Sequence, residues 1–322
     1  MFLKWITAYL LKNRIRALVI TFAISFLPVI GTLGILIAAL VTLCKGLTEG
    51  FVFTIVAVLP YVIGVFFPGK TPDVILPIII LGIVGWVASG LFTWLFAAIL
   101  YRKGTFKTIL QYGALLGILV VSVVHIIYPK IDAWWQVQLT AYLHYANQVM
   151  AATTGGDLVP NPSQIVFIDS IKYYATGLAV MTILANALVQ IGIARWWQIV
   201  GWWQIVVLNS SLNYSKPGTF RSELVSIRLD YLAGIFFAGG VLIFYIGNQV
   251  ASDVLPILYF SFFMAGLSLI HYVLAFIKTG SLFWVIMIYA AIVWLFPISL
   301  MLVALIAFID VLVDVRKYVK QN

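Results

Sequence analysis

Eight long apolar segments, separated by polar stretches, constrain the fold of this chain more than any other feature. They run from about 17 to 43, 51 to 67, 74 to 100, 109 to 128, 175 to 193, 231 to 246, 254 to 277 and 283 to 309. Most are close to the length of helix that crosses about 30 Å of hydrocarbon. Because 64% of the 322 residues are hydrophobic and only 9% are charged, too few polar groups exist to cover a soluble core. The sequence therefore predicts an all-α, polytopic integral membrane protein in a single transmembrane domain, residues 1–322.

Two of the longest segments contain breaks. The first holds Leu27-Pro28, followed by Gly31 and Gly34, and the last holds Phe296-Pro297. Proline lacks a backbone donor and restricts the residue before it. Each of these segments is therefore expected to form a hairpin of two short or re-entrant helices, which gives about eight to ten hydrophobic helices in all.

The basic residues predict the orientation of the chain. If every segment crosses once, ten basic residues lie on one side and nine on the other. With hairpins at both ends, only Lys70, Lys130 and Lys172 lie outside, and the other 16 of the 19 lie inside. Since cytoplasmic flanks are enriched in Lys and Arg, we expect a multi-pass protein with both termini in the cytoplasm. The net charge of +9 then indicates contact with membrane lipids and no nucleic-acid partner.

Two stretches lie between the predicted spans. Residues 130–174 are expected outside and contain an amphipathic helix that should lie flat on the outer leaflet. Residues 195–230 are expected to form a cytoplasmic loop rich in Trp and Arg. Its paired tryptophans, Trp196-Trp197 and Trp202-Trp203, are typical of an interfacial belt, and an aromatic ligand site is the alternative. The apolar face of the outer helix consists of Trp135, Leu139, Tyr142, Ala146 and Val149.

Three patterns together carry a family resemblance. The inner loop contains Ala194-Arg195-Trp196-Trp197-Gln198, then Asn213 to Gly218, then Phe220-Arg221-x-Glu223-Leu224-x-x-Ile227-Arg228-Leu229. The run Ala39 to Gly50 comes earlier, and Asp310-x-x-x-Asp314-x-Arg316-Lys317 comes later. In combination these patterns resemble the YybS-like bacterial membrane proteins (domain of unknown function 2232), over nearly the whole chain.

The resemblance implies a bacterial cell inner membrane location, a polytopic α-helical fold and no established activity. The YybS-like family is also distantly similar to the substrate-binding membrane components of energy-coupling-factor importers. Those components need a separate ATPase pair and a transmembrane coupling subunit.

The sequence offers little support for catalysis. Gly64 to Thr71 matches the P-loop pattern but follows a membrane segment where that motif needs a strand. The histidines at 125, 144 and 271 have no helical spacing with one another or with a carboxylate. The predicted membrane centres contain no charged residue, so a proton relay is not expected. We expect no enzyme activity, no catalytic residue, no cofactor and no metal.

Two polar stripes are the candidate ligand faces. Thr182, Asn186 and Gln190 recur every four residues on one predicted helix, and Ser261, Ser268 and His271 share a side of another. Because unpaired polar groups are costly in hydrocarbon, each stripe should face protein, water or a ligand. Interhelical hydrogen bonding is the alternative to a binding cavity.

Opposite charges on the predicted cytoplasmic face indicate ion pairs. We expect Arg221 or Arg228 to pair with Asp310 or Asp314 where the last helix leaves the bilayer. Contact with lipid headgroups is the alternative. Gly113 and Gly117 form a Gly-x-x-x-Gly face, which we assign to packing inside the molecule rather than to dimerisation.

Two functions are compatible with these patterns. The first is a small-solute binding or transport component without its own ATPase, whose small-molecule ligand the sequence does not identify. The second is a non-enzymatic scaffold or assembly factor that organises envelope proteins or another protein partner in the membrane. A central cavity above about 300 Å³ with Thr182, Asn186 and Gln190 pointing into it would favour the first, and a solid, fully packed bundle would favour the second.

Overall fold

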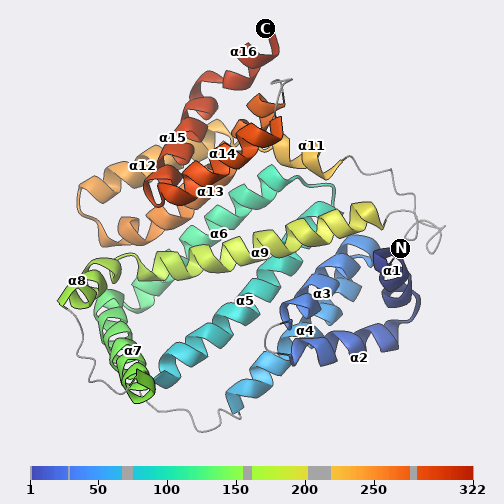
Figure 1. Ribbon diagram of the computed structural model, residues 1–322, viewed down its shortest axis with the longest axis horizontal. Coiled ribbons are helices and arrows are strands. Elements are labelled where there is room, and N and C mark those ends of the chain that lie inside the picture. The colour runs from blue at the N-terminus through green and yellow to red at the C-terminus, as the bar shows by residue number, and fades with distance from the viewer. Residues whose placement is uncertain are drawn as a thin grey trace.

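The computed structural model describes residues 2–27, 30–66, 75–154, 162–201, 219–275 and 281–321, and within these ranges the secondary structure is helical, without strands (Figure 1). The helices are α1 (Phe2–Lys12), α2 (Arg14–Ser25), α3 (Thr32–Lys45), α4 (Leu47–Phe66), α5 (Leu76–Tyr101), α6 (Phe106–Ile127), α7 (Ile131–Thr154), α8 (Pro162–Ile171), α9 (Ala175–Val200), α11 (Phe220–Val225), α12 (Tyr231–Tyr245), α13 (Gln249–Leu274), α14 (Ser281–Trp294), α15 (Ile298–Val313) and α16 (Val315–Gln321).

Five of the described helices, α4, α5, α6, α9 and α13, are long and apolar enough to cross a membrane. Four shorter apolar segments accompany them, in α3, α12, α14 and α15. The expected all-helical, membrane-type architecture is therefore present.

Both predicted breaks are present. The first apolar segment consists of α2 and α3, which pack against each other, and the last consists of α14 and α15. Pro28 lies outside the described residues, whereas Pro297 directly precedes α15. The third long segment, by contrast, is the single helix α5, because it has no proline or polar interruption past its first turn.

Two helices extend beyond their predicted ends. The apolar pattern predicted that a helix ends at Ile193, but α9 continues to Val200. Arg195 does not break a helix, and Gly201 is the first glycine after the apolar segment. The pattern began another at Val254, but α13 begins at Gln249. The Asn248 side chain accepts a hydrogen bond from the backbone at the start of α13 and so caps it.

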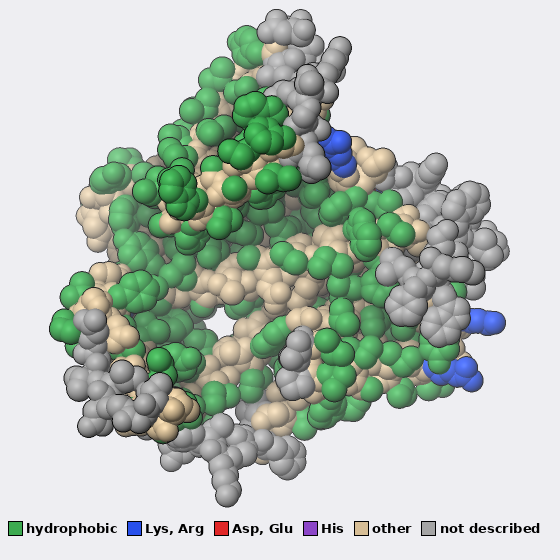
Figure 2. All heavy atoms as spheres, in the orientation of Figure 1, with side chains coloured by type: hydrophobic (Ala, Val, Ile, Leu, Met, Phe, Trp, Pro, Cys, Tyr) green, Lys and Arg blue, Asp and Glu red, His purple; other side chains and the backbone are tan. Residues whose placement is uncertain are grey.

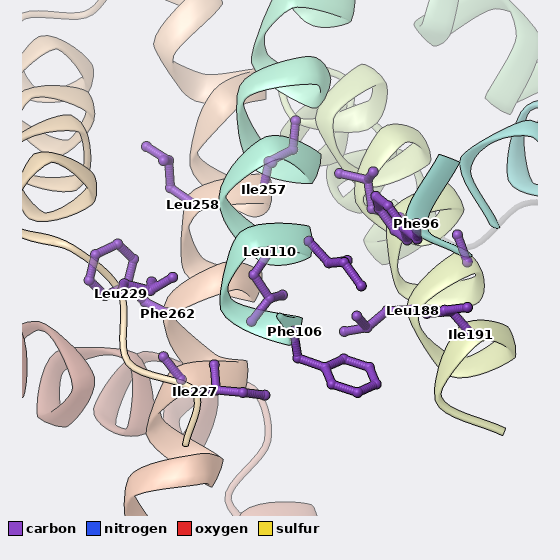
Figure 3. Packing of buried hydrophobic residues seen from close by; sticks show 14 of the residues in the cluster. Phe96, Phe106, Leu110, Leu188, Ile191, Ile227, Leu229, Ile257, Leu258 and Phe262 are labelled. Atoms are coloured by element: carbon purple, nitrogen blue, oxygen red, sulfur yellow. The ribbon is translucent and has the colours of Figure 1, made fainter. Parts of the chain in front are cut away.

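Helix α6 lies at the centre of the core, between α5 and α9 on one side and α13 on the other (Figure 3). Gly117 allows this approach: a Cβ there would lie 3.0 Å from Leu184 and 3.2 Å from Ile257. The Gly113–Gly117 face is thus used for packing within the molecule. Figure 3 shows the buried side chains around it, among them Phe96, Leu188, Ile191, Leu229, Leu258 and Phe262.

The two ends of the bundle differ. Helices α7 and α8 lie at one end, whereas α1, α11 and α16 lie toward the other (Figure 1). On the face that Figure 2 shows, apolar side chains predominate and the visible Lys and Arg side chains gather near α1 and α11. The described parts of the segments 130–174 and 195–230, predicted on opposite sides of a membrane, therefore lie toward opposite ends of the bundle.

Candidate functional site

The predicted polar stripe on α9 contacts α5. Asn186 Nδ2 donates to Ser89 Oγ at 3.0 Å, and Thr93 Oγ1 donates to Gln190 Oε1 at 2.7 Å. Gln190 Nε2 also donates to Asn186 Oδ1 at 3.3 Å. Side chains from two apolar helices thus satisfy one another, which is the arrangement expected of interhelical hydrogen bonding.

Thr182 is separate from this network. Its side chain is exposed, and Oγ1 donates to the Leu178 carbonyl of its own helix at 2.8 Å. Figure 2 shows an opening between α5 and the first half of α9, so the two helices are not in contact along their whole length. The three residues of the stripe therefore do not form one common binding surface.

The three residues of the second stripe, Ser261, Ser268 and His271, each have a different partner. Ser261 Oγ donates to the backbone of its own helix. Ser268 accepts a 3.4 Å hydrogen bond from Arg316 Nη2, and His271 Nε2 lies 3.0 Å from Tyr289 Oη on α14. Ser268 and His271 thus connect α13 to the C-terminal helices.

Arg228 pairs with both candidate carboxylates at the end of α15. Its Nη1 lies 3.0 Å from Asp314 Oδ2 and its Nε 3.8 Å from Asp310 Oδ2. Arg228 Nη2 also donates to the Asp310 carbonyl at 2.9 Å. Arg221, the other arginine considered, is exposed. In the described part of the chain, the ion pairs of the two carboxylates are with Arg228, Arg316 and Lys317.

Arg316 is the main cation of this cluster, a role that the sequence did not reveal. Arg316 Nε lies 3.1 Å from Asp310 Oδ2, and its two Nη atoms each donate to a backbone carbonyl, of Val225 and Ile227, at 2.6 Å. Asp310 is only 2% exposed. Asp314 adopts a left-handed conformation, with φ of 56°, that ends α15 and turns Arg316 back toward the bundle. No helical spacing predicts a contact made across such a turn.

A second ion pair attaches α11 to α9. Arg195 binds Glu223 through two atoms, Nε to Oε2 at 3.0 Å and Nη2 to Oε1 at 2.6 Å. Arg195 Nη1 also donates to Gln198, whose Nε2 donates to the Leu43 carbonyl at 2.9 Å. Helix α11 is thus held against α9, and Gln198 connects α9 in turn to α3.

A cavity of about 590 Å³ lies between α6, α12 and α13. Its walls are mostly apolar, and its polar residues lie near the first turns of α6 and the start of α12, apart from Ser261 on α13. Because Leu115 and Phe236 line the cavity and are exposed, it opens on the apolar side of the bundle. We call this cavity, lined among others by Leu115, Ile118, Phe236, Leu258 and Phe262, the α6–α12 groove.

Charged and amide groups surround the polar end of the α6–α12 groove. Lys107 Nζ forms an ion pair with Asp230 Oδ1, and Gln111 Nε2 donates to Asp230 Oδ2 at 2.9 Å. The hydrogen bonds from Lys107 and Gln111 hold the pKa of Asp230 below its ordinary value. Lys107 and Asp230 are the charged residues that line the groove, one of each sign. The groove thus has an apolar body and a polar, hydrogen-bonding end.

A second cavity, of about 550 Å³, lies at the opposite end of the bundle. It is lined by α7, α8 and the start of α9, and its walls are nearly all apolar. The expected apolar face of the outer helix contributes Trp135, Leu139, Tyr142 and Ala146. This face therefore lies partly against α8 and α9, although Tyr142 and Val149 are exposed.

A buried His–Asp pair joins α6 to α13. His125 Nε2 lies 2.8 Å from Asp253 Oδ2, and the two side chains are 7% and 2% exposed. Sequence reasoning missed the pair because the apolar segment was drawn from Val254, which left Asp253 outside it. Asp253 is the fifth residue of α13, so it lies near the start of that helix and not at its centre. The residues lie 128 positions apart, so no local spacing reveals the contact.

The described ranges hold no metal cluster, and they include only part of the P-loop-like stretch. They contain no group of three or more His, Cys, Asp or Glu side chains able to hold a metal ion. Of the P-loop-like stretch, Phe67 to Thr71 lies outside the described residues, as do Trp202, Trp203 and the run Asn213 to Gly218.

Comparison of the chain with protein-family models, curated proteins and solved structures finds no match. The class of the protein therefore follows from its own fold. Its described helices and their apolar surfaces are those of an α-helical membrane protein.

Proposed function

We propose that this chain is a polytopic protein of a bacterial inner membrane that binds or transports a small amphipathic solute and has no ATPase of its own. The α6–α12 groove carries the proposal. Its volume of about 590 Å³ falls within the range of small-molecule sites. Its apolar walls and single polar end suit a ligand with a hydrocarbon body and a polar head.

The solute would enter from the bilayer. Its hydrocarbon part would contact Leu115, Ile118 and Phe236, where the groove opens on the apolar surface. Its head would meet the remaining hydrogens of Lys107 Nζ and Gln111 Nε2, since each of these groups already donates one hydrogen bond to Asp230. Burial of apolar area would supply most of the binding free energy, and the polar groups would fix the orientation.

The proposed topology has both termini in the cytoplasm and about ten hydrophobic helices, including the short pairs α2–α3 and α14–α15. The gathering of charged contacts at one end of the bundle supports it. The resemblance to YybS-like proteins, and through them to importer components, supports a function in solute capture. Separate subunits would then have to supply any ATP hydrolysis.

The α6–α12 groove replaces the polar stripe as the proposed ligand site. Asn186 and Gln190 already bond to α5, and Thr182 bonds to its own backbone. Substituting Gln190 should therefore leave solute binding unchanged while weakening the α5–α9 contact.

Binding can be tested with the purified full chain and a fluorescent fatty-acid analogue as probe. We expect saturable binding that Leu115→Trp weakens at least tenfold, or by about 1.4 kcal/mol, because the indole fills the groove. Val123→Trp is the control: Val123 lies on the same helix outside the groove and is 42% exposed, against 44% for Leu115. Equal affinity in both variants would reject the groove. Mass spectrometry of co-purified lipids then identifies the natural ligand class.

An exposed apolar surface favours the alternative, a membrane scaffold. A shallow cavity of about 290 Å³ lies over α9 and α11, where Trp196 and Ile193 are exposed beside Phe220. A partner helix could pack there. A protein that co-purifies with the wild type and is lost with Trp196→Ala, while the fatty-acid probe does not bind, would favour this function.

A further inference from the structure

The His125–Asp253 pair takes no part in the proposed solute site. We infer that it is a proton-binding site, and that its proton occupancy controls how tightly α6 packs against α9 and α13. The link to the α6–α12 groove described below rests on the proposed function, whereas the proton-binding step does not.

The pair lies near the ends of two long apolar helices, with His125 in the last turn of α6 and Asp253 in the second turn of α13. Both residues belong to helices long and apolar enough to span a membrane, α6 and α13, and both are buried. Ionisable side chains in such helices are costly, and those that occur commonly serve ion or proton pathways. A purely structural contact at this place could use neutral groups, as Asn186 and Ser89 do between α9 and α5.

Three helices meet at the Asp253 carboxylate. Oδ2 faces His125 on α6, and Oδ1 accepts the Gly177 backbone N–H of α9 at 2.8 Å. The approach of α9 is so close that a Cβ at Gly177 would lie 1.7 Å from the Asp253 carbonyl oxygen. Helix α7 reaches the same place through Trp135 Nε1, which donates to Thr176 Oγ1 at 2.9 Å. We call this meeting point the outer junction.

The described groups that face the pair are uncharged, so the charge at this place comes from His125 and Asp253 themselves. Helix α9 contributes an amide and the Thr176 hydroxyl, and α7 contributes an indole, none of which titrates near neutral pH. His125 is the ionisable group that acts on the Asp253 carboxylate. The net charge at the outer junction therefore depends on whether the imidazole carries its second proton.

Charge balance gives the direction of the effect. With a protonated imidazole, the cation and the carboxylate cancel, and the outer junction is neutral. When the imidazole releases that proton to water, one uncompensated negative charge stays buried, which is unfavourable. Entry of water between the helices relieves this cost. The outer junction should therefore be closed at acid pH and looser at alkaline pH.

The same two helices connect the outer junction to the α6–α12 groove. Leu115 and Ile118 lie on α6, as does His125, and Leu258 lies on α13, as does Asp253. Helix α6 is continuous between these positions, and α13 stays helical there although Pro256 lies between Asp253 and Leu258. Loosening of α6 from α13 at the outer junction therefore changes the width of the groove, so that proton release and solute binding are coupled.

Hydrogen–deuterium exchange of the full chain in lipid nanodiscs tests the proton site. After correction for the intrinsic pH dependence of exchange, amides at the end of α6 and the starts of α9 and α13 should exchange about tenfold faster at alkaline than at acid pH. Asp253→Asn keeps the shape of the side chain but not its charge, so it should abolish this difference. The His144→Gln control, at an exposed histidine on α7, should retain it. Equal exchange at both pH values in the wild type, or a difference that survives Asp253→Asn, would overturn the proton site.

Spin labels at Tyr112 and Leu232, two exposed residues that line the groove on α6 and α12, test the coupling in a Cys44→Ala background. The distance between the labels should change with pH in the wild type and not in Asp253→Asn. A pH-dependent outer junction with a constant groove distance would overturn the coupling alone. Loss of fatty-acid binding at every pH, with a responsive junction, would reject the proposed function and leave the proton site standing.

Discussion

Replacing Arg316 with methionine should destabilise the protein severely. Methionine keeps much of the apolar stem but removes the hydrogen bonds to the Val225 and Ile227 carbonyls and the 3.1 Å ion pair with Asp310. Asp310 is 2% exposed, and its remaining cation, Arg228, lies 3.8 Å away. Removing one partner of a buried ion pair costs about 3–5 kcal/mol, because the other charge stays buried and uncompensated. We expect a loss in this range.

Lys317→Met is the matched control. Lys317 pairs with Asp314 at 3.2 Å, but its side chain is 78% exposed, so its loss should cost at most about 1 kcal/mol. Unfolding in mixed micelles with increasing SDS, followed by helical circular dichroism, gives both free energies. Asp310→Asn in the Arg316→Met background should recover part of the loss, since it removes the uncompensated charge. Equal losses for Arg316→Met and Lys317→Met would refute the reasoning.

Two further predictions concern packing and pH. Gly177→Ala should lower the free energy of unfolding by several kcal/mol in the same assay, because its Cβ would lie 1.7 Å from the Asp253 carbonyl oxygen. Gly82→Ala is the control: no atom lies within 4 Å of its Cβ, so it should stabilise α5 by up to about 1 kcal/mol. A smaller loss at Gly177 than at Gly82 would contradict this packing. For Asp230, the lowered pKa means that its contribution to stability is complete above the ordinary value of 3.8 and is lost as pH falls through the folded value. The thermal stability advantage of the wild type over Asp230→Asn should therefore shrink under acid conditions, and an advantage that grows there would contradict the contact with Lys107.

The sequence anticipated the helices well, because apolar length and helix breakers act locally. Segments without an internal break became single helices such as α5 and α6, and the break at Pro297 separates α14 from α15. Helix ends were less predictable. Arg195 ended an apolar run without ending α9, since a charged side chain is compatible with helical backbone.

The candidate site was only partly predictable from the sequence. Opposite charges near Arg228 and Asp310 indicated an ion pair, because both lie at the same predicted end of the bundle. The role of Arg316 depends on the turn at Asp314, which no spacing revealed. The polar stripe on α9 indicated that a polar partner was needed, but whether Ser89 and Thr93 or a solute would provide it depended on how α5 packs.

The sequence by itself determined that this chain has the helices of an α-helical membrane protein, and its basic residues predicted one orientation for them. Hydrophobicity, helix breaking and charge distribution are properties of short stretches, so they can be read directly from the sequence. Only the tertiary structure decided where a cavity opens and which charges meet. The α6–α12 groove and the contact between His125 and Asp253 both arise between helices distant in sequence, and the packing that brings such helices together is set by the shape of all their side chains at once.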